Sequence, residues 1–90
     1  MKHIVVDLEM NPVGKEYRDV RRKLNGEIIE IGAVRLNEDF VQEDEFQCYV
    51  CPAYGMVKKH ITELTGITQE QVAGCPGFSA CFHAFVAWIG

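Results

Sequence analysis

Residues 4–11 read IVVDLEMN, a short apolar run that ends in two carboxylates one residue apart. Branched apolar side chains in such a run favour a β-strand that is buried on at least one face. Because side chains alternate between the two faces of a strand, Asp7 and Glu9 must project to the same side. The stretch therefore predicts a strand over residues 3–9 with a pair of acids at its end.

The whole chain has the size and composition of one small domain. It has 90 residues, of which 48% are hydrophobic, and a net charge of −4. This charge disfavours bulk attraction to nucleic acid or anionic membranes, but it does not exclude a local site that carries metal ions. The sequence has neither a signal-peptide pattern nor a run approaching the roughly 20 apolar residues of a membrane span, so we expect a cytoplasmic protein with no membrane partner.

Two further strands are predicted after the first. Residues 27–36, EIIEIGAVRL, are largely apolar on both faces and predict a central strand. Residues 40–50 predict a third strand, and the short turn before it favours antiparallel pairing. Alternation in the central strand divides its apolar residues into two sets: Ile28, Gly32, Val34 and Leu36 on the face of Glu30, and Ile29, Ile31 and Ala33 on the other face.

The C-terminal third of the sequence has helical signals. Residues 62–65 predict one short helical turn that Gly66 stops. Thr68 and Gln71 have the spacing of a capping box, which predicts the start of a second short helix. Residues 78–89 predict an amphipathic helix whose apolar stripe packs on the sheet. The positions of this stripe are Phe78, Cys81, Phe82, Phe85, Val86 and Ile89.

The end of the sequence is unusually apolar for a complete domain. Trp88 and Ile89 directly precede the last residue, Gly90. A globular domain seldom ends on a hydrophobic helix, so we expect the chain to be truncated. We also expect the apolar flanks of this helix, which carry Phe78, Phe82, Phe85 and Trp88, to be exposed and to make the truncated chain self-associate.

Four cysteines raise the question of a disulfide or a metal site: Cys48, Cys51, Cys75 and Cys81. The first two have C-x-x-C spacing, but they lie in a strand-like apolar run rather than in a tight turn. The other two match no common second half-site. We therefore expect reduced, partly buried thiols, with zinc coordination as the alternative.

The connection over residues 11–26 contains five of the nine basic residues of the chain. They are Lys15, Arg18, Arg21, Arg22 and Lys23. The three arginines have helical i, i+3, i+4 spacing close to the end of the acid-bearing strand. This pattern indicates contacts with the phosphates of a bound strand, and a solvated flexible loop is the alternative.

Two carboxylates on one strand face suit Mg²⁺ or Mn²⁺, which prefer oxygen ligands and complete their shells with water and phosphate. Two such ions about 3.5–4 Å apart can activate a water and stabilise the leaving oxygen of a phosphodiester. Asp7 and Glu9 would supply part of such a two-ion site. The alternative is an exposed acidic strand end without a function, because a bare D-x-E triplet occurs by chance in many chains.

Four segments occur in this order: VVDLEMN, EIIEIGAV, YVCP and HITELTGIT. Together they resemble the N-terminal half of the DEDD-type 3′→5′ exonucleases, the superfamily of proofreading exonucleases, ribonuclease T and the histone-mRNA exonuclease group. The resemblance covers nearly all of residues 3–89. It implies an α/β fold of the ribonuclease H-like type, an antiparallel three-strand meander followed by helices. Residues 1–90 would then be the N-terminal part of a single exonuclease domain.

The resemblance also implies roles for individual residues. The Asp-x-Glu of the family's first motif matches Asp7 and Glu9, which would be the catalytic metal ligands. The residue after the Glu lines the pocket for the terminal nucleotide, a position that Met10 occupies. The segment that walls the same pocket comprises Leu64, Thr65 and Ile67. For these apolar positions, a purely structural place in the core is the alternative.

Other positions match the family's structural pattern or depart from its catalytic one. Glu30 matches the acid of the EIGAV segment, and we expect it to be buried and hydrogen-bonded, because an unpaired charge there would be costly. The family's remaining catalytic groups, a second Asp, a His and a final Asp, would lie beyond Gly90. His60 and His83 do not replace them, since His60 lies in the pocket-side segment and we expect His83 on the polar flank of the last helix.

The expected activity is that of a metal-dependent 3′→5′ exonuclease that hydrolyses phosphodiester bonds at the 3′ end of single-stranded RNA or DNA. The 90-residue chain itself is expected to be inactive. Two alternatives stay open. The first is a non-catalytic module that binds nucleic acid or a protein through the same surface, and the second is a polymerase-associated exonuclease that proofreads mismatched DNA ends.

Overall fold

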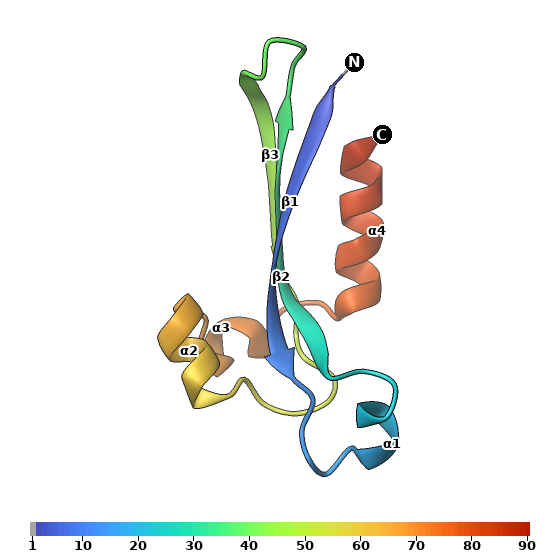
Figure 1. Cartoon of the computed structure of the whole chain (residues 1–90), viewed down its shortest axis with the longest axis vertical. Coiled ribbons are helices and arrows are strands. Elements are labelled where there is room, and N and C mark those ends of the chain that lie inside the picture. The colour runs from blue at the N-terminus through green and yellow to red at the C-terminus, as the bar shows by residue number, and fades with distance from the viewer. Residues whose placement is uncertain (1) are drawn as a thin grey trace.

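The computed structural model describes residues 2–90, which form a three-stranded antiparallel sheet with helices on both sides (Figure 1). The strands are β1 (His3–Pro12), β2 (Gly26–Leu36) and β3 (Gln42–Tyr49), and they are paired in this order. The helices are α1 (Arg18–Arg21), α2 (Lys59–Thr65), α3 (Gln69–Ala73) and α4 (Phe78–Ile89). None of the helices in this part of the chain is long and apolar enough to span a membrane. The predicted three-strand meander followed by helices is confirmed.

A β-bulge interrupts the pairing of β1 with β2 just after the acids. Glu9 opposes Glu30 in the register of the two strands. The next residue, Met10, opposes Ile28, which leaves Ile29 without a partner. An extra residue of this kind shifts the alternation of side chains by one position. The bulge also lets β1 continue to Pro12, three residues beyond the predicted end of the strand.

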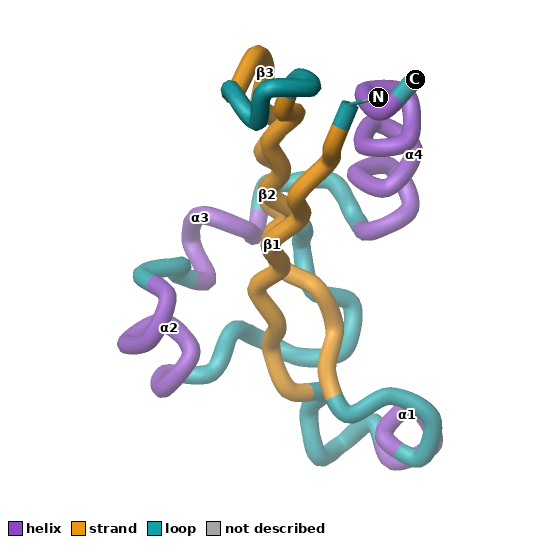
Figure 2. The backbone as a smooth tube through the Cα atoms, turned by 45° about the horizontal axis from the view of Figure 1, so that its top comes forward, coloured by secondary structure: helices purple, strands orange, loops and turns teal. Residues whose placement is uncertain are grey.

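The bulge divides the buried residues into two clusters on opposite sides of the sheet. The α2/α3 cluster consists of Ile29, Ile61, Ile67 and Val72, with Tyr49 and Val57 packed against it. The α4 cluster consists of Ile31, Val50 and Cys81, with Ile28, Phe46, Cys48 and Phe85 packed against it. Figure 2 shows α2 and α3 on one side of the strands and α4 on the other. The prediction that Ile29 and Ile31 share a face is wrong, because the alternation pattern does not reveal the bulge.

The predicted start and stop signals of the two short helices are largely confirmed. The backbone N–H of Gln71 donates to Thr68 Oγ1 at 3.2 Å, and the N–H of Thr68 donates to Gln71 Oε1 at 2.8 Å. Gly66 ends α2 in the left-handed conformation, with φ of 81°. The helix begins three residues earlier than predicted, at Lys59. The capping box and the glycine stop therefore form as the sequence predicts.

Only part of the apolar stripe of α4 packs on the sheet. Cys81 is buried, and the rings of Phe85 and Trp88 lie 5.5 and 5.7 Å from the ring of Phe46 in β3. The outer flank of α4, exposed to solvent, consists of Phe78, Phe82, Val86 and Ile89. The prediction that the whole stripe packs on the sheet is wrong. The helix packs mainly on β2 and β3, so the side chains on its outer flank contact solvent instead of these strands. The prediction of exposed flanks holds for Phe78 and Phe82 but is wrong for Phe85 and Trp88.

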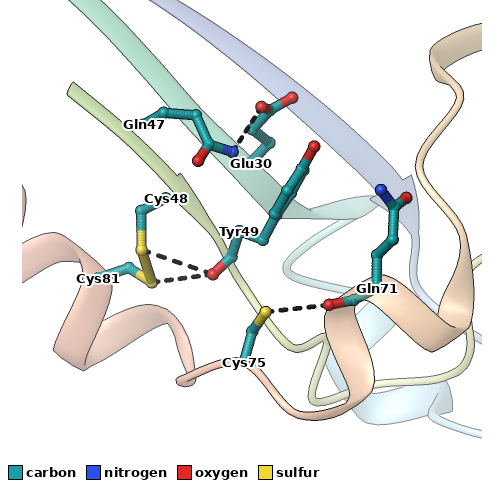
Figure 3. The surroundings of a disulfide bond; sticks show 7 residues. All are labelled: Glu30, Gln47, Cys48, Tyr49, Gln71, Cys75 and Cys81. Atoms are coloured by element: carbon teal, nitrogen blue, oxygen red, sulfur yellow. Dashed lines mark hydrogen bonds between the residues drawn. A yellow bond between two sulfur atoms is a disulfide. The ribbon is translucent and has the colours of Figure 1, made fainter. Parts of the chain in front are cut away.

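A disulfide joins Cys48 of β3 to Cys81 of α4 (Figure 3). The prediction of reduced thiols is therefore wrong for this pair, whereas Cys51 and Cys75 are free. Cys48 projects to the face that α4 covers, and its Cα atom lies 6.2 Å from that of Cys81. A separation of 33 residues gives no spacing signal in the sequence. The bond also removes Cys48 from the metal-binding pair with Cys51 that the zinc alternative requires.

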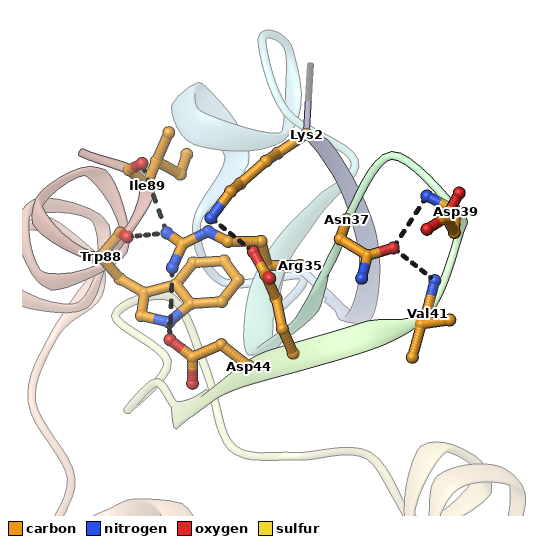
Figure 4. Close-up of polar contacts among 9 residues, drawn as sticks. Lys2, Arg35, Asn37, Asp39, Val41, Asp44, Trp88 and Ile89 are labelled. Atoms are coloured by element: carbon orange, nitrogen blue, oxygen red, sulfur yellow. Dashed lines mark hydrogen bonds and ion pairs between the residues drawn. The ribbon is translucent and has the colours of Figure 1, made fainter.

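Arg35 of β2 holds the C-terminal end of α4 in place (Figure 4). Its guanidinium donates to the carbonyl oxygens of Trp88 and Ile89 and lies 4.5 Å from the centre of the Trp88 ring. The same guanidinium pairs with Asp44 of β3 at 3.3 Å. The indole N–H of Trp88 donates to Asp44 as well, at 3.0 Å. A cation at this position satisfies the free carbonyl groups of the helix end.

Candidate active site

Asp7 and Glu9 project from the same face of β1, as the alternation of the strand predicts. Asp7 opposes Gly32, and Glu9 opposes Glu30, which in turn opposes Tyr49. Directly opposed residues of antiparallel strands project to the same face. Figure 3 shows the ring of Tyr49 pointing away from the disulfide that joins β3 to α4, and this ring packs against the α2/α3 cluster. The two acids therefore lie on the face that α4 does not cover, which we call the acid face.

The space beside the acid pair is open. Asp7 is exposed and Glu9 is half-buried. Gly32, across the ladder from Asp7, has no side chain, and a Cβ atom built there would meet only the Asp7 carbonyl oxygen, at 3.7 Å. This is an ordinary van der Waals distance, so crowding among the described residues does not require glycine at this position. Gly32 therefore adds no side chain to the acid face next to Asp7.

The donor set of the acid face fits a hard divalent cation. Carboxylate oxygens are the ligands that Mg²⁺ and Mn²⁺ prefer, and these ions take their remaining ligands from water and phosphate. Among residues 2–90, no group of three or more His, Cys, Asp or Glu side chains is arranged to hold a metal. Asp7 and Glu9 thus offer two ligands on an open face, unlike the closed four-ligand shell of a structural zinc site.

Glu30 extends the acidic row from β1 into β2. Its carboxylate accepts a hydrogen bond from Gln47 Nε2 of β3 at 2.8 Å. The prediction of a hydrogen-bonded group is confirmed, but the prediction of burial is wrong, because Glu30 is only half-buried and Gln47 is exposed. A carboxylate at this position keeps contact with water as well as with its amide partner, so its charge costs little.

Asn11, the first residue of the connection predicted from the sequence, lies in β1 and ties α2 to the end of this strand. Its side chain is fully buried. Asn11 Oδ1 accepts a hydrogen bond from the backbone N–H of Lys58 at 2.9 Å, and Nδ2 donates to the carbonyl oxygen of Met56 at 3.1 Å. Lys58 is the N-cap residue of α2. One side chain, two positions after Glu9, therefore sets where α2 lies relative to the acids. Neither periodicity nor a motif in the sequence gives a signal for this role.

The three predicted pocket residues around the end of α2 have different environments. Leu64 is 80% exposed on the surface of α2. Thr65 Oγ1 donates to the carbonyl oxygen of Ile61 at 2.8 Å and accepts from the N–H of Ile67 at 3.1 Å. The side chain of Ile67 is buried in the α2/α3 cluster. Leu64 is thus the member of this group with an apolar side chain available to a ligand.

Met10 lies on the other side of β1. It follows Glu9 in the strand and projects to the opposite face, where it is 44% exposed. There it lines a pocket with a volume of about 430 Å³, together with Leu24, Ile28 and Phe78 among others. The residues that line this pocket do not include those at the end of α2. The structure therefore does not bring Met10 together with Leu64, Thr65 and Ile67.

Comparison with known proteins shows similarity to exonucleases. The exonuclease family model of the RNase T type matches residues 4–90. ERI1 exoribonuclease 2 of Mus musculus is 38% identical over 88 residues, which cover 96% of this chain and 12% of the relative. The PolC-type DNA polymerase III of Clostridium perfringens is 41% identical over 66 residues, which cover 73% of this chain and 4% of the relative.

Solved structures give the same result at the level of the fold. The nuclease domain of 3′hExo, a DEDDh family member bound to rAMP, superposes with a TM-score of 0.80 at 29% identity, over 98% of this chain and 43% of that one. A 3′-exonuclease that recognises the 3′ end of the histone mRNA stem-loop superposes with a TM-score of 0.79 at 28% identity, over 97% of this chain and 38% of that one.

The fold is that of the ribonuclease H-like exonucleases, as the sequence predicts. The chain belongs to the exonuclease family. It spans less than half of the length of each of these relatives and solved chains.

Proposed function

We propose that the chain forms the acid-bearing part of a divalent-metal-dependent 3′→5′ exonuclease that acts on single-stranded RNA or DNA. The observation that carries the proposal is the position of Asp7 and Glu9 on the open acid face. Two relatives support action at a 3′ end and RNA as one of the two substrates, because one solved neighbour is bound to rAMP and another recognises the 3′ end of an mRNA stem-loop.

In this proposal, Asp7 and Glu9 hold Mg²⁺ or Mn²⁺. When bound, these ions supply an activated water and neutralise charge on the scissile phosphate. The chain itself positions the ligands of the ions. The pairing of β1 with β2 fixes both carboxylates on one strand face, and Asn11 fixes α2 beside this face. The exposed side chain of Leu64 offers an apolar surface to the terminal base.

The remaining assignments stay predictions from the family resemblance. These are the contacts of Met10, Thr65 and Ile67 with the terminal nucleotide. The cytoplasmic location also stays a prediction, and it comes from the sequence pattern instead of the resemblance. Two carboxylates leave most of an ion's coordination shell to water. We therefore expect the 90-residue chain to bind Mn²⁺ weakly and to hydrolyse no phosphodiester bonds by itself.

A second candidate function is proofreading of DNA ends by a polymerase-associated exonuclease. The 41% identity with a PolC-type DNA polymerase III favours it. The two candidates use the same acids and differ in substrate. Binding of the chain to a mismatched DNA primer end, compared with a single-stranded RNA of equal length, distinguishes them.

The test of the metal site is a titration of the 90-residue chain with Mn²⁺. We expect calorimetry to detect weak binding that Asp7→Asn abolishes. In NMR spectra, paramagnetic Mn²⁺ should broaden the amide signals of Gly32 and Gln47, which lie on the ladder of Asp7. Asp39→Asn is the matched control, since Asp39 is an exposed acid in the turn between β2 and β3. Equal affinity in Asp7→Asn and the wild type would show that the metal assignment is wrong.

A further inference from the structure

The connection between β1 and β2, which carries α1, lies at the end of the molecule opposite the start of β1 and the end of α4 (Figure 1). Side chains of this connection form a hollow. The hollow has a volume of about 510 Å³. It is lined by Lys15, Arg18, Arg21, Arg22 and Asn25, and we call it the basic hollow. Four cationic side chains thus surround one open space outside the acid face.

The connection is held in place and is not a free loop, because several contacts join it to the sheet and to the segment before α2. The N–H of Val13 donates to the carbonyl oxygen of Asn25 at 3.0 Å, and the N–H of Gly14 donates to that of Tyr54 at 2.7 Å. The ring of Tyr17 meets the ring of Tyr54 edge-on at 5.7 Å. Val13 is buried. These contacts argue against the solvated flexible loop that the sequence left open.

The charge of this segment is opposite to that of the chain. Residues 15–23 contain five basic and two acidic side chains, a net charge of +3, whereas the whole chain has a net charge of −4. One of the arginines, Arg22, lies 3.9 Å from Asp19, and both side chains are almost fully exposed. Such a pair is screened by water and contributes little. Among the described residues, Lys15, Arg18 and Arg21 form no ion pair within 4.0 Å, in contrast with Arg35, which pairs with Asp44.

We propose that the basic hollow binds the backbone phosphates of single-stranded nucleic acid, separately from the acid face. Arginine guanidinium groups form forked hydrogen bonds that match phosphate geometry, and unpaired cations release counterions when phosphates bind. The hollow is open and lined by charge, so it contacts the backbone without reading bases. Nucleic acid is chosen as the source of phosphate because the chain belongs to an exonuclease family, and in this the inference rests on the proposed function.

The test measures binding without catalysis and without metal. The 90-residue chain is titrated into a fluorescently labelled single-stranded oligonucleotide in EDTA, and anisotropy is followed at several salt concentrations. Arg18→Gln/Arg21→Gln should weaken binding about tenfold at low salt and reduce the slope of log K against log salt by about 1.4, the value for two phosphate contacts on a single strand. Circular dichroism confirms that the variant is folded.

The matched control is Lys2→Gln/Lys59→Gln, which also removes two positive charges but lies outside the hollow. We expect its affinity to stay within about twofold of the wild type and its salt slope to change little. Equal losses in the two double variants would show that only net charge matters and would overturn the proposal. Undetectable oligonucleotide binding at low salt, or tighter binding to vesicles with anionic phospholipid than to the oligonucleotide, would also overturn it.

The inference and the proposed function fail in different ways. Asp7→Asn tests the metal site and should leave the metal-free binding of the oligonucleotide unchanged. If Asp7→Asn keeps its Mn²⁺ affinity while the arginine variant loses oligonucleotide binding, the proposed function fails and the basic hollow stands. If Asp7→Asn loses its Mn²⁺ affinity while the arginine variant keeps its oligonucleotide binding, the metal site is supported and the proposal for the basic hollow fails.

Discussion

The two buried clusters, on opposite sides of one sheet, are held together in different ways. The α4 cluster combines aromatic packing with the disulfide between Cys48 and Cys81 and with the contacts of Arg35 at the helix end. The α2/α3 cluster contains no disulfide, and polar side chains hold its helices: Asn11 bonds to the backbone before α2, and Gln69 Oε1 accepts from the N–H of Val57 at 2.7 Å. The segment beside the acids is therefore positioned by a few hydrogen bonds, and the opposite side by apolar and covalent contacts.

This difference assigns separate tasks to the two sides. Packing around α4 stabilises the sheet that carries the acids by burying apolar surface, an interaction that has no preferred direction. Hydrogen bonds from buried side chains are directional, so they fix α2 at a defined distance from β1. Substitutions on the two sides should therefore have different consequences for stability and for local order.

The largest effect is expected for Ile29→Ala, which removes a fully buried side chain at the bulge from the α2/α3 cluster. A cavity at such a site costs about 3–4 kcal/mol of unfolding free energy. Denaturant titration measures the loss, and hydrogen exchange should show it first in α2 and α3. Ile89→Ala, the same substitution at an exposed position, is the control and should cost less than about 1 kcal/mol. Equal losses would show that Ile29 is not the centre of a cluster.

The bulge at Ile29 also marks the limit of what the sequence could predict. Local patterns, such as the apolar run of β1, the capping box at Thr68 and the helical period of α4, depend on neighbours in sequence. The strand, the cap and the helix that they predict are present, although β1 continues past the acids to Pro12. The partner of Cys48 and the role of Asn11 depend on residues 33 and 47 positions away, for which spacing gives no signal.

The same limit applies to the candidate site. The common face of Asp7 and Glu9 follows from alternation within one strand and needs no tertiary information. The positions of Met10 and Leu64 depend on the bulge and on the attachment of α2, and the structure places them on different sides of β1. Contacts that join distant segments therefore decide which of the predicted site residues can act together.

The next effect concerns the covalent link of the α4 cluster. Reduction of the disulfide should cost about 3 kcal/mol, since a closed loop of 33 residues restricts the unfolded chain. Thermal unfolding with and without reductant measures this difference. Cys48→Ala should unfold at the same temperature under both conditions, whereas Cys51→Ala, which changes a free cysteine, should keep the full response. A wild-type protein insensitive to reductant would contradict the contribution of the disulfide.

A smaller effect on stability is expected for Asn11→Ala. The substitution leaves the N–H of Lys58 and the carbonyl of Met56 without their partner, and it should cost about 2 kcal/mol. Hydrogen exchange in α2 should accelerate more than in α4. Asn37→Ala is the control, because within residues 2–90 Asn37 Oδ1 accepts from backbone N–H groups of its own turn only, those of Asp39 and Val41 (Figure 4). If both variants loosen α2 equally, Asn11 does not position this helix.

The smallest effect on folding is expected on the outer flank of α4, where Phe82 and Val86 are exposed. On the sheet face that α4 covers, β1 exposes Val6 and Leu8 as well. We expect the 90-residue chain to self-associate through this apolar surface and to bind a hydrophobic dye.

Phe82→Gln/Val86→Gln should reduce light scattering and dye fluorescence severalfold, while the unfolding free energy changes by less than about 1 kcal/mol. Met56→Gln, which removes an exposed apolar side chain from the loop before α2, should leave both signals unchanged. A wild-type chain that stays monodisperse and does not bind the dye would show that exposure of this flank does not cause association. A loss of association in Met56→Gln equal to that of the double variant would place the contact away from α4, so the two outcomes separate the existence of the association from its location.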